Sequence, residues 1–574
     1  MHPTTRRAAA VSILLLLLGV LAAPAARAQA PAWQTVTALQ GLSTAVTATA
    51  TGPGGFVFMV GSFSGTAAFG ATQLTSAGST DVFVAKWDPG TRTFVWAQRA
   101  GGNAADEATG VAVQGANVYV TGNFSSPTAA FGPATLPNAN TAATGPTADA
   151  FLTKLVDAGS TGSFGWTQRF GGGHEELSTG VAVVGSSVYV CGQFRSATVA
   201  FGSTTLVNEG IYNVFVAKLT DAGATGSFVW ARQAGGTETD GVGGLAVSGS
   251  SVYIGGYFYS PTATFGPFTL INSVATRTDG FVAKLADAGA SADFAWVLPI
   301  TGDYDDYVTS LKASGNNVYL SGSFNSPIVT IGGSALGNAS SRISTDSFVA
   351  KATDAGATSS FVWARQAGGA SDDVFSALAL NGQSIYLAGS FKGNAQFGST
   401  TLASQGDADI CVVKLTDAGT TGSFVWAQQA GGSGRDRGLA IAFAGTSMCL
   451  VGSVEGMGTA TFGPLALPNS LKQPLGFVAT LTDPTLTATT GPRPAPAFDL
   501  VPNPAHCTVA VQLPATTGPA TPTLRDGLGR TVRTATLPAT SPRHQLDLAG
   551  LPAGLYVVQV ATGAATTTRR LTVE

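Results

Sequence analysis

Residues 227–258 read SFVWARQAGGTETDGVGGLAVSGSSVYIGGYF, and with small changes this stretch occurs seven times. Tryptophan marks one position of the repeat, at Trp33, Trp96, Trp166, Trp230, Trp296, Trp363 and Trp426. A glycine that follows an aromatic-rich segment marks another, at Gly61, Gly122, Gly192, Gly256, Gly322, Gly389 and Gly452. The tryptophans are 63 to 70 residues apart. A fixed period of this length indicates an array of similar structural units.

Each unit consists of strand signals. The fourth copy contains GGLAVSG, SVYIGGYF, DGFVAKL and DFAWVL, which are rich in Val, Phe, Tyr and Ala. The intervening SGSS and ADAGASA supply turn residues. Four antiparallel strands per unit and seven units predict an all-β, seven-bladed β-propeller.

The two ends of the repeat region complement each other. The last copy stops after its third strand, GFVATLTDP, near Pro484, whereas the first copy begins with an orphan strand, PAWQTVTAL, around Trp33. We therefore expect the Trp33 strand to complete the seventh blade and to cover its edge.

Composition narrows the class of protein. The net charge is −3, and only 11% of the residues are charged, so a nucleic-acid binder with a basic stripe is not expected. Residues 1–28 read as a signal peptide, with Arg6 and Arg7, an apolar run from Val11 to Leu21 and a small-residue exit at Ala26-Arg27-Ala28. No later apolar run is long enough to span a bilayer, so the mature protein is expected to lack a transmembrane segment.

These signals divide the chain into four parts: a signal peptide at 1–28, a propeller at 29–484, a Pro/Thr-rich linker at 485–497 and a small β-sandwich at 498–574. The linker reads TLTATTGPRPAPA, and the tail alternates strand runs such as TVAVQL and GLYVVQV.

The tail resembles the type A C-terminal sorting domain of the type IX secretion system of Gram-negative Bacteroidota. The residues that carry the resemblance are Pro502-Asn503-Pro504, the stretch Asp526-Gly527-Leu528-Gly529-Arg530, the stretch Leu551-Pro552-Ala553-Gly554-Leu555-Tyr556, and Arg569-Arg570-Leu571. The usual terminal lysines are arginines here. The resemblance implies recognition by the type IX secretion machinery and export through the periplasm and across the outer membrane, to the cell surface or the medium.

The repeats are similar to the bacterial β-propeller repeat (SBBP-like) family, through the DxFVAKL and VYVxG patterns between Trp33 and Pro484. Membership implies the fold but no agreed activity. The spacing between the second and third strands varies most among the copies, so the face that carries these connections is the expected binding surface.

An acidic residue recurs at the entry to the innermost strand of each unit except the first: Asp106, Glu176, Asp240, Asp306, Asp373 and Asp436. A ring of these carboxylates is a candidate ligand site for sugar hydroxyls or for Ca²⁺. Alternatively, each carboxylate accepts backbone N–H bonds within its own glycine-rich turn. The recurring lysines, such as Lys86, lie at the opposite end of the strand, so an ion pair between each lysine and the following acid is not expected.

Asp303, Asp305 and Asp306 form the densest acidic cluster and are candidate ligands for Ca²⁺, although the spacing is not that of an EF-hand. The sequence otherwise predicts no cofactor. The four cysteines, Cys191, Cys411, Cys449 and Cys507, read as small apolar residues, with a Cys411–Cys449 disulfide as the alternative.

Catalytic patterns are scarce. Only His174, His506 and His544 remain after removal of the signal peptide. We therefore expect a secreted or surface-attached binding or adhesion module that is not an enzyme and whose ligand is an extracellular glycan or protein. The alternatives are a glycan-degrading enzyme that uses the repeated carboxylates and an inert surface or matrix protein. An enzyme site would start in the fifth copy, where WVLPITGDYDDY replaces the WARQAGG pattern.

Overall fold

The computed structural model describes residues 31–41, 43–140, 148–340, 344–470, 472–486, 499–512, 520–526, 529–534, 543–562 and 565–574. The predicted signal peptide and most of the predicted linker lie outside these residues. The described chain is all-β, and its one helical turn is the 3₁₀ turn η1 (Pro53–Gly55). None of its helices is long and apolar enough to cross a membrane.

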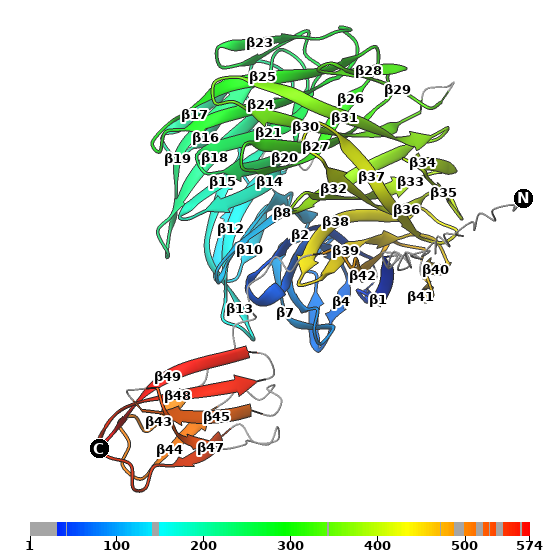
Figure 1. The fold of residues 1–574 in the computed structure, drawn as a ribbon. Coiled ribbons are helices and arrows are strands. Elements are labelled where there is room, and N and C mark those ends of the chain that lie inside the picture. Colours follow the sequence, from blue (N-terminus) through cyan, green and yellow to red (C-terminus); the bar gives the residue numbers. More distant parts are fainter. Residues whose placement is uncertain are drawn as a thin grey trace, which may run out of the picture.

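Seven four-stranded antiparallel units follow one another along the chain (Figure 1). We number them one to seven. The first strands are β2 (Ser43–Thr51), β8 (Asp106–Gln114), β14 (Glu176–Val184), β20 (Asp240–Ser248), β26 (Asp306–Ser314), β32 (Asp373–Asn381) and β38 (Arg437–Ala444). The second strands are β3 (Val57–Ser64), β9 (Asn117–Phe124), β15 (Ser187–Phe194), β21 (Ser251–Phe258), β27 (Asn317–Phe324), β33 (Ser384–Phe391) and β39 (Ser447–Val454).

The third strands are β6 (Asp81–Asp88), β12 (Asp149–Asp157), β18 (Asn213–Asp221), β24 (Asp279–Asp287), β30 (Asp346–Asp354), β36 (Asp409–Asp417) and β42 (Leu475–Thr482). The fourth strands are β7 (Thr93–Gly101), β13 (Gly162–Phe170), β19 (Gly226–Ala234), β25 (Ala292–Gly302), β31 (Ser359–Gly369), β37 (Gly422–Ala430) and, for unit seven, β1 (Ala32–Ala38).

A short hairpin lies between the second and third strands of every unit. The hairpins are β4 (Thr66–Phe69) with β5 (Thr72–Thr75), β10 (Thr128–Phe131) with β11 (Ala134–Pro137), β16 (Thr198–Phe201) with β17 (Thr204–Val207), β22 (Thr262–Phe265) with β23 (Phe268–Ile271), β28 (Ile328–Ile331) with β29 (Ser334–Gly337), β34 (Asn394–Phe397) with β35 (Thr400–Ala403), and β40 (Gly458–Phe462) with β41 (Leu465–Asn469). Three of them extend the sheet of the preceding unit, because β10 pairs with β7, β28 with β25 and β34 with β31. Part of the connection that the sequence assigned to a binding face therefore joins neighbouring units.

The first strands contact one another in a cyclic order, in which each packs beside the next and β38 packs beside β2. Threonine hydroxyls reinforce these contacts. Thr109 Oγ1 donates to the carbonyl of Ser178 at 2.8 Å, and Thr51 Oγ1 donates to the carbonyl of Phe443 at 2.8 Å. The second of these bonds joins unit one to unit seven, residues that are almost 400 positions apart in the sequence.

The recurring glycine of the second strand has a steric cause. The register between the first and second strands shifts opposite this glycine, as between Ala108 and Gly110 in unit two. A Cβ atom on Gly122 would lie 2.1 Å from the carbonyl oxygen of Glu107, far inside contact distance. Only glycine therefore allows the two backbones to approach at this bulge.

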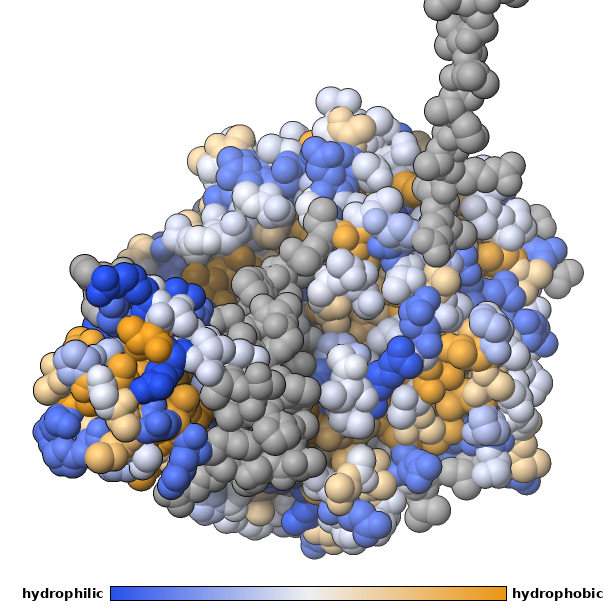
Figure 2. All heavy atoms as spheres, turned by 60° about the horizontal axis from the view of Figure 1, so that its bottom comes forward, coloured by the Kyte–Doolittle hydropathy of each residue, from blue (hydrophilic) through white to orange (hydrophobic). Residues whose placement is uncertain are grey.

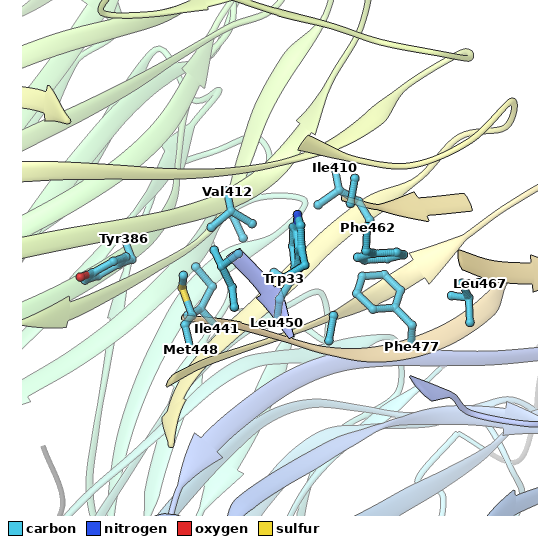
Figure 3. Packing of buried hydrophobic residues seen from close by; sticks show 14 of the residues in the cluster. Trp33, Tyr386, Ile410, Val412, Ile441, Met448, Leu450, Phe462, Leu467 and Phe477 are labelled. Atoms are coloured by element: carbon cyan, nitrogen blue, oxygen red, sulfur yellow. The ribbon is translucent and has the colours of Figure 1, made fainter. Parts of the chain in front are cut away.

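Trp33 anchors the N-terminal strand. The expected pairing is confirmed, since β1 runs antiparallel to β42 in the sheet of unit seven. The side chain is 5% exposed, and its ring meets Phe462 edge-on, with centroids 5.2 Å apart. Figure 3 shows Trp33 among Ile410, Phe462 and Leu450, so one cluster joins the N-terminal strand to units six and seven.

The C-terminal strands form two further antiparallel sheets around a separate hydrophobic cluster. One sheet has the order β43 (Asp499–Val501), β44 (Thr508–Gln512) and β47 (Arg543–Asp547). The other has the order β46 (Thr531–Thr534), β45 (Ala520–Arg525), β48 (Gly554–Thr562) and β49 (Ala565–Val573). Among the described residues, no strand of these sheets pairs with a strand of the seven units.

Replacement of Trp33 by alanine should destabilise the array of seven units by about 3–5 kcal/mol, because it removes a buried ring that fills the space against Phe462. Urea unfolding followed by tryptophan fluorescence measures the change. Trp33→Phe is the matched control and should lose less than half as much, since the indole N–H has no hydrogen-bond partner here. Equal losses in the two variants would show that the apolar ring does not anchor β1.

Candidate functional site

Charged side chains meet between consecutive units in a repeated arrangement that we call the aspartate clasp. An aspartate at the end of the third strand of one unit binds the lysine of the third strand of the preceding unit. The pairs are Lys86–Asp157, Lys154–Asp221, Lys218–Asp287, Lys284–Asp354, Lys351–Asp417 and Lys414–Asp483, with Nζ–Oδ2 distances of 2.6–2.7 Å. Their side chains are 3–12% exposed, so these are buried ion pairs.

The same aspartate also receives neutral donors. In the clasp of Asp221, the hydroxyl of Tyr119 donates to Oδ2 at 2.6 Å and the indole of Trp166 donates to Oδ1 at 2.9 Å. Each clasp therefore uses the recurring lysine of the repeat. Five of the six also use the recurring tryptophan, the exception being the clasp of Asp483, where the buried indole N–H of Trp426 has no hydrogen-bond partner among the described residues. Five of the six use the recurring tyrosine, the exception being the clasp of Asp157. This pairing was not predicted, although the near-constant separation of each lysine from an aspartate one repeat later, such as Asp157 for Lys86, is visible in the sequence.

The clasp keeps its carboxylate ionised. Burial by itself would raise the pKa of Asp221, but the hydrogen bonds from Lys154, Tyr119 and Trp166 outweigh burial and lower the pKa to about 2. The pKa values of Asp287, Asp354, Asp417 and Asp483 are lowered for the same reasons. Burial removes both charged groups of the pair from water. The additional hydrogen bonds compensate for this loss of hydration.

Among the described residues, no lysine–aspartate clasp joins unit seven to unit one. Thr480 stands where the other units have lysine, and Cys449 stands where they have tyrosine, opposite Thr480 in the register. The hydroxyl of Thr480 instead lies 2.6 Å from that of Thr35. A cavity of about 440 Å³ lies at this junction, and Thr480 and Asp88 are among its lining residues. The N-terminal strand thus joins the sheet of unit seven by pairing and packing at the junction where the lysine of the clasp is missing.

The six candidate ligand carboxylates are buried in turns between units. Asp106, Glu176, Asp240, Asp306, Asp373 and Asp436 are 0–2% exposed. Asp106 shows the pattern, since its Oδ2 accepts from the backbone N–H of Gly102 at 2.6 Å and from the hydroxyl of Ser126 at 2.7 Å. Backbone donors also bind Glu176, Asp240, Asp373 and Asp436. The contacts therefore favour a role within the turn, and a ligand role remains a prediction.

Each of these acids lies near a further acidic or amide residue that begins the third strand of the preceding unit. A Cβ atom on Gly101 would lie 2.8 Å from Oδ2 of Asp106 and 2.9 Å from Oδ1 of Asp81. Burial raises the pKa of Glu176 to about 7, and burial together with nearby carboxylates such as Asp279 raises the pKa of Asp306 to about 8. The structure therefore pairs acids that the sequence shows far apart.

The candidate calcium ligands do not converge. Asp303 is exposed, Asp305 accepts from the backbone N–H of Thr278 at 3.1 Å, and Asp306 is buried beside Ser326. Within the described ranges, no three His, Cys, Asp or Glu side chains are grouped so as to hold a metal ion. Calcium binding by this cluster remains a prediction. The four cysteines are free, so the alternative Cys411–Cys449 disulfide is absent from the structure.

Aromatic side chains gather at units four and five, at the same end of the first strands as the repeated acids. The rings of Tyr257 and Tyr307 meet edge-on with centroids 5.1 Å apart, and both are half-buried. The guanidinium of Arg277 lies 4.7 Å from the ring centre of Tyr304 and pairs with Asp305 at 3.4 Å. We call these five residues the tyrosine cluster.

At the repeat position of Tyr257, tyrosine occurs in unit four alone, and at that of Tyr307 it occurs in unit five alone. The residues equivalent to Tyr257 are Ser62, Asn123, Gln193, Ser323, Ser390 and Ser453, and those equivalent to Tyr307 are Ala45, Glu107, Leu177, Gly241, Val374 and Arg437. The departure of the fifth copy was visible in the sequence, but its contact with Tyr257 of the fourth was not.

The motif residues of the tail interlock. The side chain of Asn503 brackets β49, because its Nδ2 donates to the carbonyl of Arg570 at 2.8 Å and its Oδ1 accepts from the N–H of Thr572 at 2.9 Å. Arg530 closes a turn through its 2.8 Å ion pair with Asp526, and Gly529 lies in that turn with φ of 79°. The hydroxyl of Tyr556 donates to the carbonyl of Pro552 at 2.9 Å.

The remaining predicted sorting residues lie around these contacts. Pro502 and Pro504 flank Asn503, whereas Gly554, Leu555, Arg569 and Arg570 are exposed. The tail thus presents several motif side chains at its surface.

Replacement of Asp417 by asparagine should destabilise the array by about 3–5 kcal/mol at pH 7, because it leaves the buried ammonium of Lys351 without its counter-charge. The pKa of Asp417 is lowered on folding, so its contribution is present above the ordinary pKa of 3.8 and is lost as the pH falls through the folded value. The difference from the wild-type protein should therefore narrow below pH 4 in urea titrations.

Asp407→Asn is the matched control, since Asp407 forms an exposed ion pair with Lys392. It should leave the urea midpoint nearly unchanged. A loss as large as that of Asp417→Asn would contradict a special role for the clasp.

Stability of the array should also fall as the pH rises from 5 to 8. Glu176, Asp306 and Asp373 have folded pKa values of about 7, 8 and 7, so the folded state holds protons that the unfolded state has already released. The urea midpoint at each pH measures the slope. Glu176→Gln should make the urea midpoint less dependent on pH, whatever the absolute stability of the variant. An unchanged pH dependence would show that Glu176 does not contribute to it.

Comparison with known proteins identifies the tail. A family model described as the secretion system C-terminal sorting domain matches residues 499–574. No curated protein matches the chain. The expected resemblance of the tail is therefore confirmed: residues 499–574 are a secretion-system C-terminal sorting domain, and the protein is exported by type IX secretion to the cell surface or the extracellular space.

Proposed function

We propose that the seven units form a β-propeller of SBBP-like repeats that acts outside the cell as a glycan-binding or adhesion module, delivered there through its sorting domain. The cyclic contacts of the first strands support the propeller, since β38 returns to β2 after seven units. The pairing of β1 with β42 supports closure by the N-terminal strand. We take the boundaries of this module as residues 29–484.

The distribution of charge supports binding rather than catalysis by the repeated residues. The six clasps occupy the repeated lysines and DAG aspartates, and turn hydrogen bonds occupy the buried carboxylates of the first strands. Groups used in this way six times over are part of the scaffold. A ligand is then recognised by what differs between units.

The observation that carries the proposal is the tyrosine cluster of units four and five. Tyr257 and Tyr307 combine partly exposed ring surface with hydroxyl groups, and Arg277 and Asp305 lie in the same cluster. Sugars present C–H faces to aromatic rings and hydroxyl groups to polar neighbours, so a mixed aromatic and polar surface suits a glycan.

The exposed large hydrophobic side chains lie on separate segments of the described chain, such as Ile271, Ile328 and Val425. Figure 2 shows hydrophilic and hydrophobic residues intermixed over the face that it presents. Scattered apolar residues of this kind are ordinary for a protein surface.

The mature chain, residues 29–574, should bind a member of a panel of soluble polysaccharides without releasing new reducing ends. Replacement of both Tyr257 and Tyr307 by alanine should weaken that binding by about tenfold or more, because stacking and apolar contact are lost together. Affinity electrophoresis with and without Ca²⁺ measures the binding. The control pair Tyr257→Phe and Tyr307→Phe keeps the rings and should retain most of the affinity.

Other outcomes would replace the proposal. New reducing ends would favour a glycan-degrading enzyme, and loss of activity on replacement of Asp306 would then point to the repeated carboxylates. Binding that needs Ca²⁺ and is lost when Asp303, Asp305 and Asp306 are replaced together would instead support the predicted metal site. No binding across the panel would favour an inert surface or matrix protein.

A further inference from the structure

A cavity of about 400 Å³ lies where all seven first strands meet, and every one of them contributes to its lining. It is formed by the second halves of these strands, away from the carboxylates and tyrosines that mark their first residues. Its size falls within the range of small-molecule pockets and exceeds the roughly 150 Å³ that suffices for benzene.

The lining is neutral and mainly apolar, with one exception. Leu245, Ile441 and Phe443 are typical of its apolar side chains, and Thr49 and Thr51 supply hydroxyl groups. Lys312 of β26 is the one charged residue among the lining residues. Any charged group of a ligand in this cavity would therefore meet a single positive charge.

Lys312 also breaks the repeat at its own position. The equivalent residues of the other units all line the cavity, and all are alanine: Ala50, Ala112, Ala182, Ala246, Ala379 and Ala442. The sequence LAVSG of unit four becomes LKASG in unit five. The scaffold therefore does not require lysine here, unlike the lysines of the clasps.

The ammonium of Lys312 has no counter-charge. Among the described residues, no hydrogen bond or ion pair engages it, and no acid lines the cavity. The side chain is exposed to the open space of the cavity, yet protein surrounds it on all sides. This desolvation lowers the pKa of Lys312, and an anion beside it would relieve the cost of the isolated charge.

We propose that the cavity binds a small, largely apolar carboxylate, with the carboxylate on Lys312 Nζ and the hydrocarbon body against the Leu, Ile, Val and Phe side chains of the neighbouring first strands. One charge-assisted hydrogen bond fixes the orientation of the ligand, and burial of its apolar surface provides the remaining affinity. This site lies apart from the tyrosine cluster, so it does not depend on the glycan binding proposed above.

Isothermal titration calorimetry of the mature chain with octanoate and with its neutral counterpart octanamide tests the site. One octanoate should bind per chain, at least about tenfold more tightly than octanamide, because only the carboxylate forms the charge-assisted bond. Lys312→Ala, which restores the alanine of the other six units, should remove this preference. Lys392→Ala, at an exposed lysine outside the cavity, should retain it.

Failure to bind octanoate, or an unchanged preference in Lys312→Ala, would overturn the proposal. The urea midpoint of each variant shows whether it is folded. Ala246→Trp, which fills the cavity from unit four and keeps Lys312, should abolish binding of both compounds if the cavity is the site. Loss of glycan binding with octanoate binding intact would count against the proposed function alone.

Discussion

The buried aspartate at the end of each third strand is the constraint on which the array depends. It accepts from an ammonium and, in most units, from an indole N–H and a phenol of the preceding unit, as Asp221 does from Lys154, Trp166 and Tyr119. Each donor comes from a different strand of that unit or from a different position along it. One carboxylate therefore fixes the position of one sheet relative to the next, and six such carboxylates fix the whole series.

The same arrangement explains how the chain closes. At the junction of units seven and one, Thr480 and Cys449 stand at the positions of the recurring lysine and tyrosine, so the lysine of the clasp is missing there. Closure depends instead on β1, whose backbone pairs with β42 and whose Trp33 fills the core beside Phe462. The strand β1 comes from the opposite end of the chain. Its backbone pairing with β42 and its buried Trp33 hold this junction, at which the repeat supplies no lysine.

We infer function from the residues that differ from the repeat. The turn carboxylates and the clasp residues recur in six units, and each stabilises a contact that also occurs six times. Tyr257 with Tyr307, and Lys312 in a ring of alanines, occur once. The two tyrosines lie at units four and five, at the end where the first strands begin, whereas Lys312 lies in the second half of the first strand of unit five. The two proposed sites therefore use positions at which the repeat does not require one residue type.

Local patterns in the sequence determined the four main strands of each unit and the sorting domain, because alternation, turn residues and short motifs act between residues that are close in the chain. The pairing of the Trp33 strand followed from the complementary ends of the repeat region. The short hairpin between the second and third strands of each unit was not predicted. The sequence also showed that Lys86 would not meet the next first-strand acid, since the two stand at opposite ends of a strand.

Only the tertiary structure decided the partner of that lysine, the burial of the six carboxylates and the convergence of seven first strands on Lys312. The lysine pairing and the cavity depend on contacts between units roughly one repeat or more apart, whereas the carboxylates combine contacts within the turn, such as those of Asp106 with Gly102 and Ser126, with packing against the preceding unit. The packing of whole sheets sets the geometry that brings those residues together, and a local sequence pattern does not predict that packing.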